Sequence, residues 1–246
     1  MSVPLKKHYE YRSGYRATIG KQAVIFRLPV LAGPTLQDVM SAASEMELKL
    51  QKWVEDTYQK KPEAFSRLVP VSVPDQGYIT VMEQEFEVAI SKDRKFKSHK
   101  ATVDVGNPFL IHIELTGSDR RSEAVIVDAL LSRIFSDRYH HTIWRRLQEL
   151  NNRFFQVRVD GLRLKNTTSV WGSCTSSGNI NLSSRLLLVP QHSRDSVIIH
   201  ELAHRIEMNH SARFWALVYD AMPTYDEAHD ELKKYDRGLR FLPVGK

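Results

Sequence analysis

The sequence of 246 residues predicts an α+β fold, in which a β-rich N-terminal part precedes a mostly helical part built around a small sheet. Residues 1–117 consist mainly of short runs that are apolar, or that alternate between apolar and polar side chains, as strands do. After residue 119, most segments have helical periodicity and only a few short strand-like runs separate them. Gly117 and Ser118 mark a boundary, so we expect a β-rich N-terminal subdomain over 1–117 and a second domain over 118–246.

In the first part, strand-like runs lie at 22–29, 78–81, 85–91, 101–105 and 109–115. A helix is expected over about 35–60, because Thr35 and Asp38 form a pair typical of a capping box. Lys60-Lys61-Pro62 ends this helix. Its apolar residues form one stripe that we expect to be buried: Leu36, Val39, Met40, Ala43, Leu50, Trp53 and Val54.

The second part is expected to begin with a largely helical stretch over 119–155, followed by a strand within 157–164. Residues 167–171 and 179–182 flank a turn rich in Ser, Thr and Gly, which predicts a β-hairpin. Helices are then expected over 193–206, 212–222 and about 225–237, the last one after Pro223.

The helix over 193–206 carries the most informative motif, His200-Glu201-Leu202-Ala203-His204. Ser193 is a plausible N-cap, and the apolar neighbours of the histidines indicate a buried helix. Residues four apart lie on the same face of a helix, so the two imidazoles can share one Zn²⁺ at roughly 2.0–2.1 Å. Glu201 lies about 100° around the helix from His200, where it can act as general base toward a water at the metal.

A catalytic zinc site needs a third protein ligand and an open fourth position. His210 is the natural candidate, because ten residues separate it from His200 as in the longer H-E-x-x-H-x-x-G-x-x-H pattern. Glu207 stands where that pattern has Gly, so we expect Asn209 to supply the left-handed turn. Ser211 can then cap the helix that follows. The alternatives are Glu207 as the rival third ligand, and a motif that arises by chance on a partly exposed helix face.

The motif belongs to a longer pattern that resembles the YgjP-like metallopeptidase family, whose members look like relatives of the SprT-like and Wss-type zinc proteases. The resemblance is specific over about 140–230. It rests on W-G-S-C, G-N-I-N-L, H-E-L-x-H and N-H-S-x-x-F-W with the Pro between them, here Trp171, Gly172, Ser173, Cys174, Gly178, Asn179, Ile180, Asn181, Leu182, Pro190, His200, Glu201, His204, Asn209, His210, Ser211, Phe214 and Trp215.

This resemblance implies a zincin-like catalytic domain, with the active-site helix packed on a small sheet. It also implies one Zn²⁺ per chain held by His200, His204 and His210, with Glu201 as the catalytic residue and a polypeptide as substrate. The sequence departs from the family at Val170, because the residue before the Trp is commonly Arg in the family. Any role of that Arg is therefore in doubt here.

The expected hairpin suggests how substrate would bind. An edge strand beside the metal helix can pair with an extended peptide, so we place the hairpin as a substrate-binding wall, with Asn179 or Asn181 in contact with substrate. Alternatively, these asparagines close turns and the hairpin only packs under the helix. Cys174 is the only cysteine, and a small buried apolar role suits it better than that of a ligand or nucleophile.

Composition limits the class of protein. A single cysteine excludes an internal disulfide framework and fits a reducing compartment. The first residues contain no apolar segment typical of a signal peptide, and no apolar run approaches 18 residues. We therefore expect a cytoplasmic protein without a membrane partner. The sequence does not predict an oligomeric state.

The net charge of +6 includes a dense basic stretch over 92–100, KDRKFKSHK. A basic loop carrying Phe96 could bind nucleic acid through phosphates and stacking, whereas the alternative is an exposed loop between two strands. A function of another class is therefore a DNA-associated binding protein whose metal site is structural and closed by four ligands. A metal-dependent hydrolase of a non-peptide amide is a further alternative.

Overall fold

The computed structural model describes residues 5–10, 15–20, 23–29, 36–60, 72–117, 119, 121–235 and 239–245. These residues form helices and three small sheets, which confirms the predicted α+β class. The chain divides into two compact units, Met1–Val71 and Ser72–Lys246, called here the N-terminal and C-terminal units.

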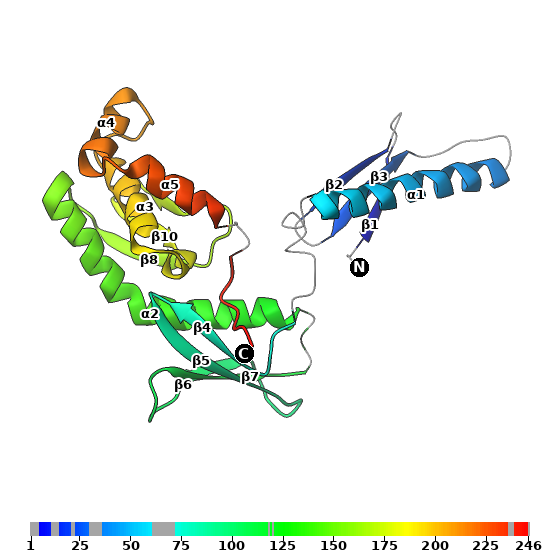
Figure 1. The fold of residues 1–246 in the computed structure, drawn as a ribbon, viewed down its shortest axis with the longest axis horizontal. Helices are drawn as coiled ribbons and strands as arrows, with labels where there is room; N and C mark the ends of the chain where they lie inside the picture. The colour runs from blue at the N-terminus through cyan, green and yellow to red at the C-terminus, as the bar shows by residue number, and fades with distance from the viewer. Residues whose placement is uncertain are drawn as a thin grey trace. The chain divides into compact units, whose positions relative to one another are not determined.

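The described residues of the N-terminal unit form one sheet and one helix (Figure 1). Its strands are β1 (Leu5–Glu10), β2 (Arg16–Ile19) and β3 (Val24–Pro29). They lie in the order β1-β3-β2, with β1 parallel and β2 antiparallel to β3. Helix α1 (Leu36–Lys60) contributes Leu50 to a small core with Val24, Phe26 and Leu28.

The predicted apolar stripe of α1 is confirmed only in part. Leu50 is buried and Val54 packs against the same core, but Trp53 is 38% exposed, so its predicted burial is wrong. The side chains of Leu36, Val39, Met40 and Ala43, and the predicted helix signals at Thr35 and 61–62, lie outside the described residues.

The C-terminal unit begins with a four-stranded sheet in the order β4-β5-β7-β6. All four strands were predicted, with small shifts at their ends: β4 (Gln76–Val81), β5 (Gln84–Lys92), β6 (Lys100–Val103) and β7 (Leu110–Leu115). The two-residue turn between β4 and β5 has Met82 and Glu83 at positive φ, which matches the twist of an antiparallel hairpin.

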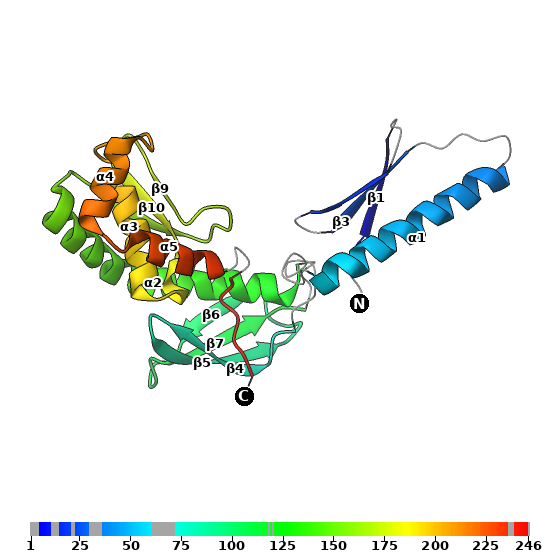
Figure 2. The ribbon, with the colours of Figure 1, turned by 45° about the horizontal axis from the view of Figure 1, so that its top comes forward.

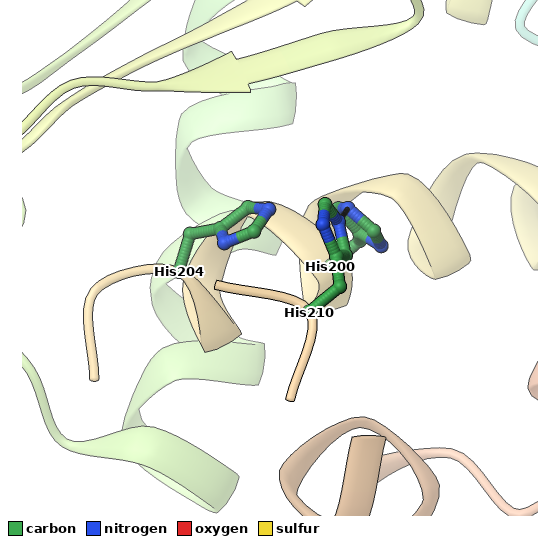
Figure 3. A group of neighbouring side chains, drawn as sticks. All are labelled: His200, His204 and His210. Atoms are coloured by element: carbon green, nitrogen blue, oxygen red, sulfur yellow. Dashed lines mark hydrogen bonds between the residues drawn. The ribbon is translucent and has the colours of Figure 1, made fainter. Parts of the chain in front are cut away.

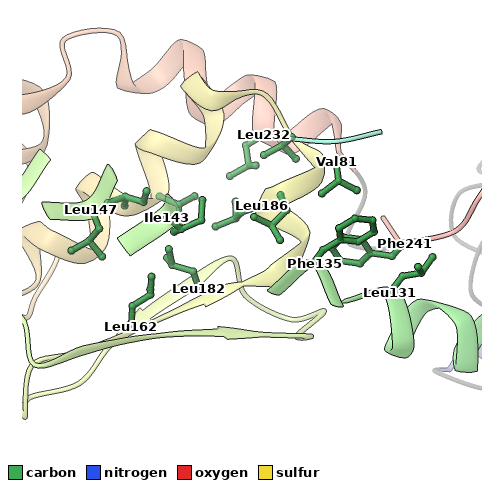
Figure 4. Close-up of a cluster of buried hydrophobic side chains, with 14 of the residues drawn as sticks. Val81, Leu131, Phe135, Ile143, Leu147, Leu162, Leu182, Leu186, Leu232 and Phe241 are labelled. Atoms are coloured by element: carbon green, nitrogen blue, oxygen red, sulfur yellow. The ribbon is translucent and has the colours of Figure 1, made fainter. Parts of the chain in front are cut away.

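Helix α2 (Glu123–Leu150) runs without a break and continues into one π-helical turn, Asn151–Phe155. Phe135 packs against Phe86 of β5 with ring centroids 4.9 Å apart. Further along α2, Ile143 and Leu147 pack with Leu162 and Leu182, which belong to the second, three-stranded sheet of the C-terminal unit (Figure 4). One continuous core therefore joins both sheets through α2.

This shared core explains why the units divide at Val71 and Ser72, whereas the sequence placed the boundary at 117 and 118. The four-stranded sheet buries its apolar face, including Val88, Ile111 and Ile113, in the same cluster as α2. A sheet with one apolar face needs a covering layer, and here that layer comes from residues beyond 118. The expected β-rich subdomain over 1–117 is therefore divided between the two units.

The second sheet has the order β8-β10-β9, and its strands β9 and β10 lie beside helix α3 (Gln191–Ala203) (Figure 2). Its strands are β8 (Gly161–Lys165), β9 (Gly172–Cys174) and β10 (Asn179–Ser183). The predicted hairpin exists as β9 and β10, but its first strand begins at Gly172 and not at Thr167. β9 forms one edge of this sheet, and helix α3 contacts both β9 and β10.

The described helices include none whose length and apolar character would suit a membrane span. The basic residues 93–99 connect β5 to β6, two strands that are separated in the sheet by β7. Lys92, at the start of this stretch, pairs with Asp75 at 2.9 Å and with Glu123 at 3.0 Å.

Candidate metal centre

Helix α3 (Gln191–Ala203) carries the first half of the site. Its N-cap is Pro190 and not the predicted Ser193, which lies in the first turn and donates a hydrogen bond to Glu231 of helix α5 (Tyr225–Lys234). Two further polar residues of this buried helix are paired. Arg194 donates to the carbonyl oxygens of Leu186 and Val189, both at 3.0 Å, and Asp195 pairs with Arg146 of α2 at 2.8 Å. These bonds hold α3 firmly against its neighbours.

The structure brings together the three predicted ligands His200, His204 and His210, which come from α3 and the turn after it (Figure 3). One nitrogen from each ring can be chosen so that all three lie within 4.8 Å of one another. The Nε2 atoms of His200 and His210 are 3.1 Å apart. Three imidazole nitrogens this close form a set that could hold one metal ion.

The chain reaches His210 by a different turn from the one predicted. Within the described residues, Asn209 is not among those with positive φ, so the predicted left-handed turn there is wrong. Helix α3 ends at Ala203, whose carbonyl accepts from the backbone N–H groups of Ile206 at 3.0 Å and Glu207 at 2.9 Å. Tightened bonds of this kind satisfy the last carbonyls of a helix without a left-handed residue.

Helix α4 (Ala212–Ala221) fixes the third histidine from the other side. The predicted cap at Ser211 is confirmed, because its Oγ accepts from the backbone N–H of Phe214 at 3.3 Å. The fully buried Phe214 ring lies 4.5 to 4.9 Å from the ring centroids of His200, His204 and His210. Phe214 is therefore the common packing surface of the three imidazoles.

A second layer of hydrogen bonds orients two of the histidines. His204 Nδ1 donates to the carbonyl oxygen of Glu207 at 3.1 Å, and His200 Nδ1 lies 3.1 Å from the Tyr225 hydroxyl of α5 (Tyr225–Lys234). A proton on Nδ1 leaves the Nε2 lone pair free for a metal, which is the usual arrangement of metal-binding histidines. Glu207 thus takes part through its backbone, and its carboxylate is not in the ligand cluster.

The electrostatics of the site favour neutral imidazoles. Burial, together with the neighbouring histidines, lowers the pKa of His200 to about 4. Burial also lowers the pKa of His204. A histidine must be deprotonated to bind a metal, so these groups are in their binding form at neutral pH.

Glu201 lies beside the histidine cluster and is 4% exposed. Its Oε2 is buried and has no hydrogen-bond partner among the described residues. Burial raises the pKa of this carboxyl to about 8. A buried carboxyl without a partner is costly and is typical of a functional group, and a nearby cation would favour its charged form.

A cleft of about 620 Å³ opens beside His200 and Glu201. It lies between the β9 side of the sheet and α5, and its lining includes Gly172, Tyr225 and His229. Tyr225 is only 4% exposed, and its hydroxyl lies 3.1 Å from His200 Nδ1. No local pattern marks Tyr225, because only the packing of α5 against α3 brings it to His200.

The remaining predicted residues lie away from the cleft lining. Asn179 and Asn181 alternate along β10 with the buried Ile180 and Leu182, so they project from the sheet face opposite to α3. Asn181 donates to Ser173 Oγ at 3.3 Å, and Asn179 donates to Ser177 Oγ at 3.2 Å. Their predicted contact with substrate stays a prediction. Cys174 is half-buried, and its Sγ lies 3.6 Å from the Thr175 carbonyl oxygen.

Residues 39–235, most of the chain, match the YgjP-like family, metallopeptidase domain. The chain belongs to this YgjP-like family. The assignment confirms the resemblance inferred from the W-G-S-C and H-E-L-x-H motifs, and it makes the chain a metallopeptidase by family, which implies a metal ion.

One solved structure found by comparison is the crystal structure of the metallopeptidase zymogen of Pyrococcus abyssi abylysin. It is similar to this chain at 23% identity with a TM-score of 0.33, and the match covers 36% of this chain and 89% of the other. A comparison with curated proteins found no match.

The residues present fit the metal ion that the family implies. His200, His204 and His210 offer three imidazole nitrogen ligands, and Glu201 Oε2 is buried beside them with no hydrogen-bond partner among the described residues. Three protein ligands and a free carboxyl are typical of catalytic sites, since structural zinc sites are closed by four protein ligands.

Proposed function

We propose that this protein is a zinc-dependent metallopeptidase that hydrolyses peptide bonds with Glu201 as the general base. The observation that carries the proposal is the pairing of the three-histidine cluster with the buried, unpartnered carboxyl of Glu201. His200, His204 and His210 would hold one Zn²⁺ per chain, because imidazole ligands suit zinc. The ion, when bound, supplies Lewis acidity at the reacting carbonyl and water.

Glu201 has the chemistry and the position to move protons during hydrolysis. Its carboxylate would accept a proton from the attacking water and then deliver it to the nitrogen of the leaving amine. The low exposure of Glu201 keeps bulk water from competing for these transfers. His229 and Tyr225 line the same cleft, so the substrate meets further polar groups beside Glu201.

The substrate we propose is an extended polypeptide segment. β9 forms one edge of its sheet, and Gly172 of β9 lines the cleft together with Glu201. A peptide added to this edge by backbone hydrogen bonds would pass the catalytic groups. This arrangement places the peptide backbone against β9, whereas Asn179 and Asn181 would contact substrate only on the opposite face of the sheet.

The proposal is tested with purified protein loaded with zinc and incubated with unfolded casein, with released peptides identified by mass spectrometry. Wild type is expected to release peptides, and chelator is expected to stop the release. Glu201→Gln should retain one zinc per chain but lose about 10²–10⁴-fold in rate, because the amide cannot accept the proton. Glu149→Gln is the matched control, because this exposed carboxylate of α2 pairs with Arg146 and belongs neither to the ligands nor to the cleft lining.

Normal cleavage by Glu201→Gln would show that the mechanism is wrong. Cleavage of small non-peptide amides but not of casein would move the function to a different hydrolase. A third outcome is that the protein retains zinc, hydrolyses neither casein nor small amides, and binds duplex or single-stranded DNA in a salt-dependent way. That outcome would favour a DNA-associated protein with a structural metal. Zinc content after purification without added metal tests the cofactor itself.

A further inference from the structure

We infer that Gly172 is a positioning residue for Glu201: the missing side chain at this position of β9 forms the slot that holds the Glu201 carboxyl at the cleft. This inference rests on the proposed function, since it assigns the part of the chain that positions the proposed general base. Gly172 lies in β9, the edge strand of the second sheet, and as a glycine it has no side chain that could bond to Glu201.

The contact is one of close approach. A Cβ atom placed on Gly172 would lie 2.8 Å from Glu201 Cγ and 2.9 Å from Glu201 Cδ, and nearer still to Oε1. Real Cβ contacts essentially never fall below 3.0 Å. The overlap involves the middle of the Glu201 side chain as well as its tip, so a small rotation of the carboxyl alone would not relieve it.

The backbone at Gly172 does not itself require glycine. Gly178 is the glycine with positive φ among the described residues, at 91°, and Gly172 does not share that conformation. An alanine could therefore adopt the backbone of β9 at position 172, and in a strand it would normally be preferred to glycine. The Glu201 side chain is the obstacle, which points to a requirement of the site and not of the strand.

Glu201 has little room to move aside. It is 4% exposed and its helix is packed against β9, β10, α4 and α5. No described side chain holds Oε2 by a hydrogen bond. The carboxyl is therefore held by shape, with the backbone of β9 on one side, and a Cβ at position 172 would push it from its place.

A double-mutant cycle in the metal-free protein tests this inference without any need for peptidase activity. The variants are Gly172→Ala, Glu201→Ala and the two combined, each followed by thermal unfolding. Gly172→Ala alone should lower the unfolding midpoint by at least about 3 °C, as overpacking does. In the Glu201→Ala background, the same substitution should leave the midpoint unchanged or raise it, because the slot is empty.

Gly161→Ala is the matched control. Gly161 lies in β8 of the same sheet, and a Cβ there would meet Asn179 Oδ1 at 2.9 Å, the free end of a side chain that can turn away. Its effect on the midpoint should be smaller and should not depend on residue 201. An equal loss for Gly172→Ala in both backgrounds would overturn the inference and make Gly172 a requirement of the strand itself.

The functional readout separates positioning from substrate binding. Gly172→Ala should still bind one zinc, because the three histidines are untouched, while kcat on a casein-derived peptide falls by about a hundredfold with little change in KM. A raised KM with unchanged kcat would overturn the inference in favour of a role of β9 in binding alone. Should wild type prove inactive, the proposed function fails, yet the unfolding cycle still decides whether Gly172 accommodates Glu201.

Discussion

The two halves of the metal site are supported in different ways. His200 and Glu201 lie within α3, which is buried, bonded on several sides by polar side chains and packed against other helices. His204 lies at the very end of α3, and the exposed His210 follows a tight turn. The first half is held by the core of the C-terminal unit, whereas the second depends on Phe214, Ser211 and the backbone of the turn.

The candidate metal site therefore combines a rigid part, held by the core, with a part whose position depends on a short turn and its immediate contacts. The helix carrying His200 and Glu201 would keep its place without metal, because the bonds of Arg194 and Asp195 and the burial of its apolar residues do not depend on a bound ion. His210 is fixed by a capped helix start and by one aromatic ring. We therefore expect the two halves to contribute unequally to metal affinity.

The largest expected effect comes from removing single ligands. His200→Ala should abolish zinc binding, since it removes the ligand of the rigid half. His210→Ala should lose most of its zinc during purification but bind it again at raised zinc concentration, because His200 and His204 remain paired on α3. Elemental mass spectrometry before and after zinc titration measures both. Equal zinc affinity in His200→Ala and His210→Ala would contradict an unequal contribution of the two halves. One zinc per chain in both variants would mean that another residue serves as a ligand.

A smaller effect is expected from the hydroxyl that orients His200. Tyr225→Phe keeps the ring but removes the hydrogen-bond partner of His200 Nδ1. Zinc affinity should fall by about 10–100-fold, as it does when such supporting partners are lost, while the unfolding midpoint of the metal-free protein changes little. Competition with a chelator of known affinity gives the number. Tyr219→Phe is the control, because that hydroxyl donates to Asp226 and not to a ligand.

The smallest effect is expected at Glu207. His204 bonds to the backbone carbonyl of this residue, so truncation in Glu207→Ala should leave zinc affinity within a factor of about two. The same chelator competition applies. A tenfold or larger loss would make the Glu207 carboxylate a ligand and would replace the three-histidine site.

Much of this site could be predicted from the sequence, because its chemistry lies in one short segment. The spacing of His200 and His204 places them together on any helix, and the Ser211 cap depends only on local backbone geometry. The strands β4, β5, β6 and β7 could be predicted equally well, because alternation of apolar and polar residues is visible in the sequence without any tertiary information. By contrast, the exposure of Trp53 depends on neighbours that local patterns do not contain.

The types of most elements, the three histidines that could hold a metal ion and the family were predictable from local sequence patterns. The division into units, the hydroxyl beside His200 and the close approach of Gly172 to Glu201 became visible only in the folded chain. The two groups of features differ in the sequence distance over which they act. Helical periodicity and capping act over a few residues, but burial, close approach and shared cores join residues that are far apart in the chain, and these contacts exist only after the sheet and helices have packed together.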